Sequence, residues 1–116
     1  MKRVWYIDPH SGGEKISPQD YNLIVAQAVA YETKQAWYPK FKLQLQFKNQ
    51  FCYLAGIKEG KEAFPIGRLR YFGSNRWSLA FYAYSNESYK PCLFPDGGWF
   101  GTLENAINIC SVYLTD

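Results

Sequence analysis

The residues from Lys40 to Lys48 constrain the fold more than any other part of the sequence. Four large apolar residues alternate there with lysines and glutamines: Phe41, Leu43, Leu45 and Phe47. Successive side chains of a strand point to opposite faces, so this segment predicts a strand with one apolar face and one polar face. That pattern is typical of an antiparallel sheet that is covered on one side only.

Four further strands follow, separated by turn signals at intervals of about ten residues. We expect them at Phe51–Ile57, Ala63–Phe72, Arg76–Tyr84 and Tyr89–Phe94. Pro65 and Gly67 predict a bulge or an edge position at the start of the second of these four. No helical pattern interrupts the series, which therefore predicts an antiparallel meander. Val4–Ile7 predicts one more short strand, at an edge.

Helix signals lie on both sides of the strands. Ser17 is placed to cap a helix that has Pro18 in its first turn, and the apolar spacing continues to about Gln35. Thr102 is placed to cap a second helix, whose apolar stripe is Leu103, Ala106, Ile107, Cys110 and Leu114. We therefore expect residues 1–116 to form a single α+β domain. Its architecture would be a two-layer sandwich of a four- to five-stranded antiparallel meander with an N-terminal and a C-terminal helix.

Charge, cysteines and hydropathy exclude several classes of protein. The net charge of +3 permits an anionic partner without requiring one. The three cysteines are Cys52, Cys92 and Cys110, and their odd number and lack of a CxxC spacing argue against disulfides and a zinc site. We expect no signal peptide, because only Val4–Ile7 follow Lys2 and Arg3 before Asp8, and no membrane span, because no apolar run approaches about 18 residues. We expect a cytoplasmic protein without a membrane partner.

No motif for catalysis stands out. His10 is the only histidine, and it lies beside Asp8 and Ser11 in a glycine-rich loop. A catalytic triad needs an oriented base and an oxyanion hole, which three neighbours in a loop do not provide. The segment Ser11–Lys15 lacks the spacing of a phosphate-binding loop, because Ile16 follows Lys15. We therefore assign no catalytic residue, no metal ligand and no cofactor.

The polar face of the predicted sheet is the best candidate for a function. Alternation places these residues on it: Lys40, Lys42, Lys48, Arg68, Arg70, Tyr82, Tyr84 and Lys90. Cations interleaved with aromatic rings suit single-stranded nucleic acid, because the charges contact phosphates and the rings stack on bases. The alternative is a solvated or self-associating face, since cross-strand Arg–Tyr pairs stabilise a sheet without a ligand.

Aromatic residues make up 19% of the chain, and packing does not account for all of them. Alternation assigns Phe41, Phe47, Tyr71, Trp77 and Phe81 to the apolar side of the strands. Trp99 and Phe100 lie between glycines just before the second helix, where we expect them to pack onto that helix as a hydrophobic staple. The alternative is an exposed aromatic lip. Together with Tyr89 they are candidates for contact with a protein partner.

Part of the chain resembles a known group of proteins. The residues Leu69-Arg70-Tyr71, then Trp77–Tyr82, then Gly101–Ala106 are similar to small uncharacterised bacterial proteins from phage, plasmid and mobile-element neighbourhoods. These proteins carry a comparable pair of strands followed by a short helix. The resemblance covers less than half of the chain and implies a bacterial accessory or interaction protein, with no catalytic residue.

The basic strand residues also resemble those of the RelE/HigB-type toxin ribonucleases. That resemblance implies that Arg68, Arg70 and Arg76 contact RNA. The chain departs from the toxins in having one N-terminal helix where they usually have two, and in lacking their basic C-terminal strand. We therefore expect a non-enzymatic binding module that contacts single-stranded nucleic acid. A protein–protein or homodimer module is one alternative, and a toxin ribonuclease is another.

Overall fold

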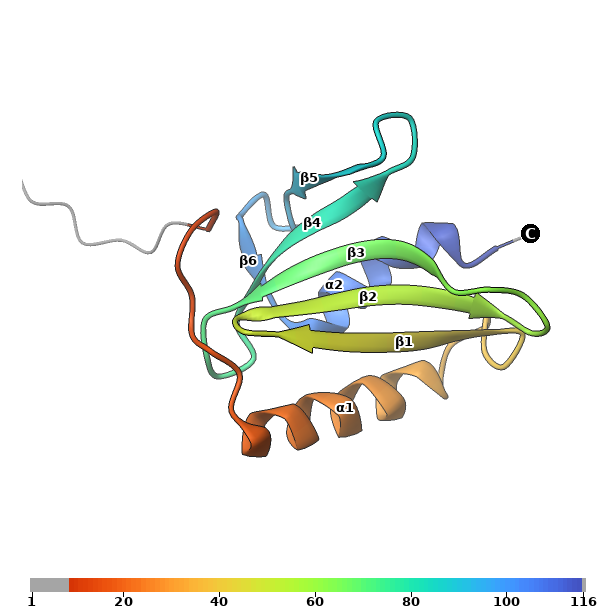
Figure 1. Cartoon of the computed structure of the whole chain (residues 1–116), viewed down its shortest axis with the longest axis horizontal. Helices are drawn as coiled ribbons and strands as arrows, with labels where there is room; N and C mark the ends of the chain where they lie inside the picture. The colour runs from red at the N-terminus through yellow and green to blue at the C-terminus, as the bar shows by residue number, and fades with distance from the viewer. Residues whose placement is uncertain (1–8, 116) are drawn as a thin grey trace, which may run out of the picture.

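The computed structural model describes residues 9–115 as a sheet with two helices on one of its faces (Figure 1). The elements are α1 Pro18–Glu32, β1 Phe41–Lys48, β2 Phe51–Lys58, β3 Phe64–Tyr71, β4 Trp77–Ala83, β5 Ser88–Cys92, β6 Phe100–Gly101, α2 Leu103–Cys110 and the short 3-10 helix η1 Ser111–Tyr113. This confirms the expected α+β class and two-layer arrangement. The strand expected at Val4–Ile7 lies outside the described residues. Within residues 9–115, neither helix is long and apolar enough to cross a bilayer.

The sheet is an antiparallel meander in the order β1-β2-β3-β4-β5, as the turn signals predict. The two-residue strand β6 was not expected. It pairs with Trp77 and Ser78 at the start of β4, whereas β5 pairs with the rest of that strand from Leu79 onward. A strand of two residues has no alternation to detect, so only the tertiary structure reveals it.

Both α-helices begin at the capping residues that the sequence predicts. Ser17 Oγ accepts a hydrogen bond from the Asp20 N–H at 3.1 Å, and Pro18 occupies the first turn of α1. α1 ends at Glu32, before the expected Gln35, and turns lead from there to β1. Thr102 Oγ1 accepts from the Asn105 N–H at 3.1 Å at the start of α2.

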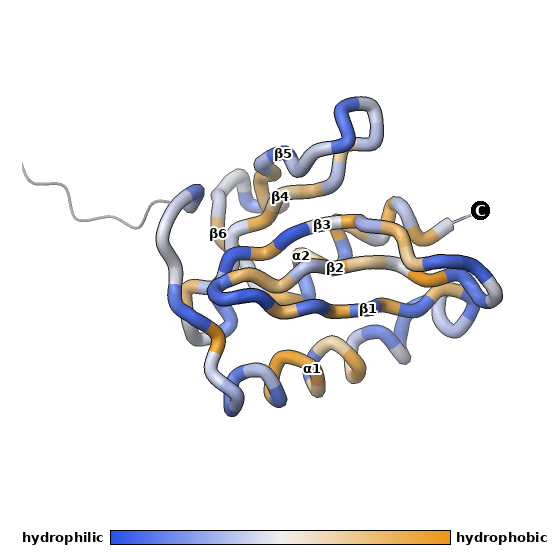
Figure 2. Tube along the Cα trace, in the orientation of Figure 1, coloured by the Kyte–Doolittle hydropathy of each residue, from blue (hydrophilic) through white to orange (hydrophobic). Residues whose placement is uncertain are grey.

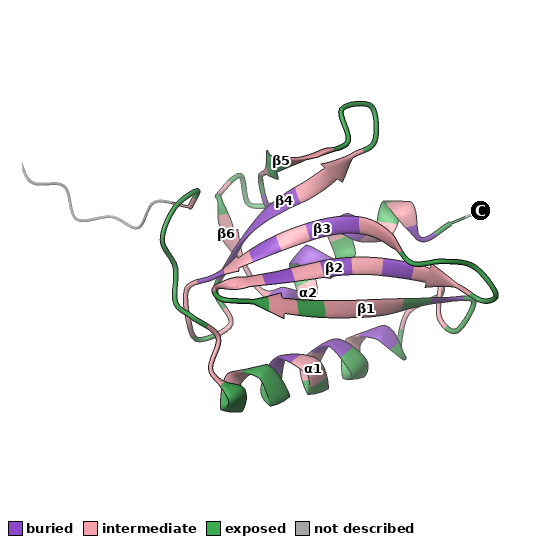
Figure 3. Cartoon of the chain, viewed as in Figure 1, coloured by how far each residue is buried: buried purple, intermediate pink, exposed green. Residues whose placement is uncertain are grey.

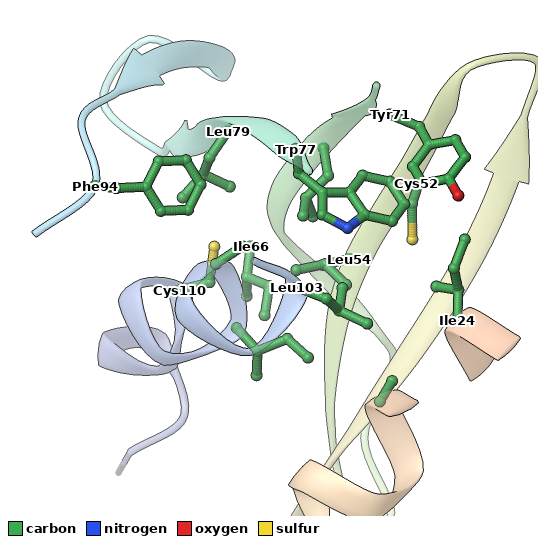
Figure 4. Close-up of a cluster of buried hydrophobic side chains, with 14 of the residues drawn as sticks. Ile24, Cys52, Leu54, Ile66, Tyr71, Trp77, Leu79, Phe94, Leu103 and Cys110 are labelled. Atoms are coloured by element: carbon green, nitrogen blue, oxygen red, sulfur yellow. The ribbon is translucent and has the colours of Figure 1, made fainter. Parts of the chain in front are cut away.

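The core lies between one face of the sheet and the two helices (Figures 3 and 4). The largest fully buried side chains are Trp77, Leu54, Ile66, Leu69, Leu103, Ile107, Cys52 and Cys110. The alternation that predicted β1 is visible along its trace in Figure 2. Cysteines 52, 92 and 110 are free, and burial raises the pKa of the Cys52 and Cys110 thiols to about 12.

A β-bulge brings α2 close to the sheet. Leu54 pairs with Gly67 and Ala55 with Pro65, which leaves Ile66 as the extra residue of β3. Ile66 and Gly67 are both buried although they are consecutive. A Cβ atom on Gly67 would lie only 2.6 Å from Cys110 Sγ, so the helix packs where only a glycine leaves room. The bulge expected from Pro65 and Gly67 is confirmed.

Replacing Gly67 by Ala should therefore lower the free energy of unfolding by about 1–3 kcal/mol, the usual effect of overpacking a core. Urea denaturation measures it. Cys110→Ala removes the sulfur atom, so in the double variant Gly67→Ala should cost less than it does alone. Strictly additive losses would contradict the close contact between α2 and β3.

A buried carboxylate connects α1 to the edge strand. Glu32 Oε2, at the C-terminal end of α1, accepts a hydrogen bond from the Leu43 N–H of β1 at 2.6 Å. An edge strand that leaves such groups unpaired can pair with other chains. The contact therefore both anchors α1 and covers part of the outer edge of the sheet.

Glu32→Ala should lower the free energy of unfolding by about 1.5–3 kcal/mol, because it removes a hydrogen bond to a charged group. Glu32→Gln keeps an acceptor oxygen and should lose less. Glu62→Ala, in the exposed turn after β2, is the control and should stay within about 0.5 kcal/mol of the parent. Equal losses for Glu32→Ala and Glu32→Gln would show that the hydrogen bond contributes little.

Candidate functional site

The face of the sheet opposite the helices, here called the open face, carries no acidic strand residue. The pairing registers place on it Lys42, Gln44, Gln46, Lys48, Phe51, Tyr53, Ala55, Ile57, Pro65, Arg68, Arg70, Ser78, Ala80, Tyr82, Tyr89, Pro91 and Phe100. In the described part of the chain, carboxylates occur only in helices, loops and turns. Glu14 and Asp20, for example, line a hollow beside α1. The open face therefore presents cations without nearby strand carboxylates.

The open face is concave. The rings of Tyr53 on β2 and Tyr89 on β5 lie 5.9 Å apart between centroids. Neighbouring strands are about 4.8 Å apart, so in a flat sheet the backbones of β2 and β5 would be separated by about 14 Å. A curl that tilts β2 and β5 toward each other brings the rings into contact, and Figure 1 shows β4 and β5 running at an angle to β1–β3. Tyr82 continues the row of rings, 5.1 Å from Tyr89.

Arg68 lies at the centre of this concave face. Its guanidinium carbon is 5.0 Å from the centroid of Phe51 and 5.2 Å from that of Tyr89. Its side chain is half-buried, and no carboxylate or carbonyl of residues 9–115 accepts a hydrogen bond from it. Two aromatic rings thus hold the position of a cation whose donors remain available to a ligand.

Tyr89 stays neutral beside Arg68. Burial is the main cause that raises its pKa above the ordinary value, and the neighbouring Tyr53 adds to the effect. The charge of Arg68 acts in the opposite direction without reversing it. The Tyr89 hydroxyl therefore keeps its proton at neutral pH and can act as a hydrogen-bond donor.

Arg70 forms hydrogen bonds within the structure. Its Nη1 and Nη2 donate to the carbonyls of Gly12 at 3.0 Å and His10 at 3.1 Å. Gln50 Nε2 also donates to the Gly12 carbonyl, at 3.3 Å. Residues 9–13, here called the N-terminal arm, are therefore fastened across one end of the open face. The Glu14 N–H continues this attachment by donating to the Tyr71 carbonyl at 2.8 Å.

Two small hollows lie on either side of Tyr89, which lines both. The arginine hollow has a volume of about 200 Å³ and is lined chiefly by Phe51, Arg68, Arg70, Ser78, Ala80 and Tyr89. The glutamine hollow has a volume of about 220 Å³ and is lined chiefly by Gln44, Gln46, Tyr53, Ala55, Pro65 and Tyr89. Small-molecule sites usually measure about 300–1,000 Å³, so each hollow suits a part of a larger ligand.

Most of the residues predicted for the polar face lie on it. Lys42, Arg68, Arg70 and Tyr82 occupy the expected strand positions. Tyr84 follows the end of β4, where its hydroxyl donates to the Pro65 carbonyl. It therefore borders the open face.

Lys40 precedes β1 and borders the open face, because it lines a hollow together with the open-face residues Lys42 and Ile57 and with Pro39 and Glu59. Lys90 was expected on the open face, and this is wrong. Lys90 pairs with Phe81, and Tyr89 pairs with Tyr82. Because a strand alternates its faces, Lys90 points to the helix side of β5.

Trp99 and Phe100 are not placed as a staple. The Phe100 ring packs at 5.1 Å against Phe72 and lies 4.3 Å from the guanidinium carbon of Arg76. Trp99 is exposed and makes an edge contact with His10 at 4.9 Å. The first N–H of α2 instead donates to the side chain of Asn75, at 3.0 Å. Phe100 pairs with Ser78 and so lies on the open face, whereas Trp99 contacts His10, which lines a hollow together with Tyr89.

Among the open-face residues that line the two hollows, Gln44, Gln46, Phe51 and Tyr53 were not proposed as site residues from the sequence. Gln44 and Gln46 alternate with the core residues of β1. This alternation predicts which face of the sheet they lie on, but it does not predict that they border a hollow. Phe51 and Tyr53 belong to a strand that is apolar on both sides, so alternation does not separate its two faces.

Comparisons with family models, curated proteins and solved structures give no match to this chain. The two resemblances seen in the sequence therefore stay predictions. Among residues 9–115, no group of three or more His, Cys, Asp or Glu side chains is placed to hold a metal ion.

Arg70→Gln should release the N-terminal arm, because it removes both hydrogen bonds to the arm carbonyls. We expect faster amide hydrogen exchange at Glu14, with unchanged exchange in the centre of β2. Arg76→Gln has the same change in charge and does not bond to the arm, so it serves as the control. Unchanged exchange at Glu14 would show that other contacts hold the arm.

Proposed function

We propose that this chain is a non-enzymatic binding module for single-stranded nucleic acid, which it contacts through the open face. The observation that carries the proposal is the placement of Arg68, held between Phe51 and Tyr89 with no acceptor among residues 9–115. The sequence resemblance adds support for a bacterial accessory protein.

The charges of the open face suit a phosphate backbone. Lys42, Lys48, Arg68 and Arg70 occupy strand positions on a surface whose strands have no carboxylate. Each contact between such a cation and a phosphate releases a condensed counterion, which favours binding at low salt. Arginine adds a planar fork of donors that matches two phosphate oxygens.

The rings favour a single strand over a duplex. Bases of a duplex are stacked on one another, whereas unpaired bases can stack on protein rings. Tyr53, Tyr82 and Tyr89 form a connected row on the concave face, with centroid distances of 5.9 and 5.1 Å between neighbours. A concave surface also encloses more of a flexible strand than a flat one does.

The competing interpretation is that these side chains only stabilise the sheet. Phe51 is directly opposite Arg70, and Tyr53 is directly opposite Arg68, which is the arrangement of stabilising cross-strand pairs. In that case the face would be solvated or would bind a protein, including a second copy of the chain. Binding measurements separate these interpretations.

The test is fluorescence anisotropy with labelled single-stranded DNA and RNA of about 12 nucleotides, at about 50 mM and 200 mM salt. We expect binding that weakens steeply with salt. Arg68→Gln should weaken it and reduce the slope of log K against log salt by about 0.7, the value for one phosphate contact of a single strand.

Lys34→Gln is the matched control, because it removes one exposed positive charge beyond the C-terminal end of α1. It should leave the slope nearly unchanged. Absence of binding at low salt, or equal effects of Arg68→Gln and Lys34→Gln, would contradict the proposal. The RNA should stay intact during the titration, and its cleavage would support the toxin ribonuclease alternative instead.

A further inference from the structure

We infer that Tyr89 divides the open face into two subsites for one nucleotide, with the phosphate in the arginine hollow and the unpaired base in the glutamine hollow. The inference rests on the proposed function and goes further, because it assigns separate chemical roles to residues on the two sides of one ring. The two hollows differ in charge, in available hydrogen-bonding groups and in the side chains that form their walls.

The arginine hollow has the chemistry of a phosphate site. Arg68 and Arg70 line it together with the rings of Phe51, Tyr89 and His10, and no carboxylate does so. Arg70 donates to the carbonyls of His10 and Gly12, so Arg68 is the arginine whose donors face no acceptor in the described chain. The rings exclude water around its guanidinium, which strengthens its attraction for an anion.

Small side chains create the space in the arginine hollow. Ser78 and Ala80 are opposite Arg70 and Arg68 across β3 and β4. Both are buried although they belong to the open face, with 6% and 8% of their surface exposed. They form the base of the hollow while the longer side chains form its rim. A phosphate seated there would meet the Arg68 guanidinium at the rim.

The glutamine hollow has the chemistry of a base site. No lysine or arginine lines it, and its walls are the rings of Tyr53 and Tyr89 together with Pro65. The amides of Gln44 and Gln46 border it from β1, and no residue of the described chain forms a hydrogen bond with either amide. An amide offers one acceptor and two donors, which match the edge of a nucleobase. Adenine is the base that pairs with a glutamine amide through two hydrogen bonds.

The position of Tyr89 connects the two sites. Its ring is fixed by contacts with Tyr53 at 5.9 Å and Tyr82 at 5.1 Å, and it lines both hollows. The phosphate and base of a nucleotide are joined through one sugar, so their sites must be adjacent but separate. Two hollows on either side of one ring meet this requirement.

The experiment compares two variants by two independent readouts. We expect the parent chain to bind an oligoadenylate at least about fivefold more tightly than an oligothymidylate, the lower end of what a bidentate base contact contributes. The double variant Gln44→Ala, Gln46→Ala should lose this preference and keep the salt slope. Arg68→Gln should weaken binding to both oligonucleotides equally and reduce the slope by about 0.7.

Gln19→Ala is the matched control for the glutamine variant, because Gln19 is exposed on α1. Thermal denaturation first shows that each variant has the same unfolding midpoint temperature as the parent chain. Equal affinity of the parent for both oligonucleotides, or a reduced salt slope in the glutamine variant, would overturn the inference and leave the proposed function intact. Absence of binding to every oligonucleotide at low salt would reject the proposed function itself.

A second measurement uses small probes and side-chain NMR signals. Adenosine monophosphate should shift both the Arg68 guanidinium signal and the amide signals of Gln44 and Gln46. Inorganic phosphate should shift only the Arg68 signal. Glutamine signals that respond to inorganic phosphate as strongly as to the nucleotide would contradict separate subsites.

Discussion

The close packing of α2 against Gly67 is the contact on which both faces of the sheet depend. A Cβ atom at this position would meet Cys110 Sγ at 2.6 Å, so the helix can approach the sheet only because β3 has no side chain there. The extra residue Ile66 next to it forms a bulge, and bulges increase the local twist of a strand. Gly67, which leaves room for α2, is therefore next to Ile66, which forms the bulge that twists the sheet.

The curl of the sheet converts ordinary strand residues into a shaped surface. Tyr53 and Tyr89 would lie far apart on a flat sheet, but on this one their rings are in contact. The same curl places Arg68 between rings from β2 and β5. The apolar side of the sheet is occupied by its own helices, so the concave side is the one that no helix covers. Packing on one face thus determines the geometry of the other.

Local patterns in the sequence were sufficient to predict the two α-helices, the five main strands and their order in the sheet. The alternation of β1, the caps at Ser17 and Thr102 and the bulge signal at Pro65 each depend on a few neighbouring residues. Lys90 was misplaced because its face depends on the register between β4 and β5, and a shift of one residue reverses every side chain of a strand. β6 and the two hollows depend on contacts between distant segments, so no local pattern predicts them.

The charge distribution explains how a chain with a net charge of only +3 can present a cationic surface. Its described carboxylates lie in helices, loops and turns: Glu14, Asp20, Glu32, Glu59, Glu62, Glu87, Asp96 and Glu104. The potential that attracts a phosphate depends on the charges within about 10 Å of it, because salt screens more distant ones. A concave surface that gathers cations and excludes carboxylates from its strands therefore creates a stronger field than the net charge suggests.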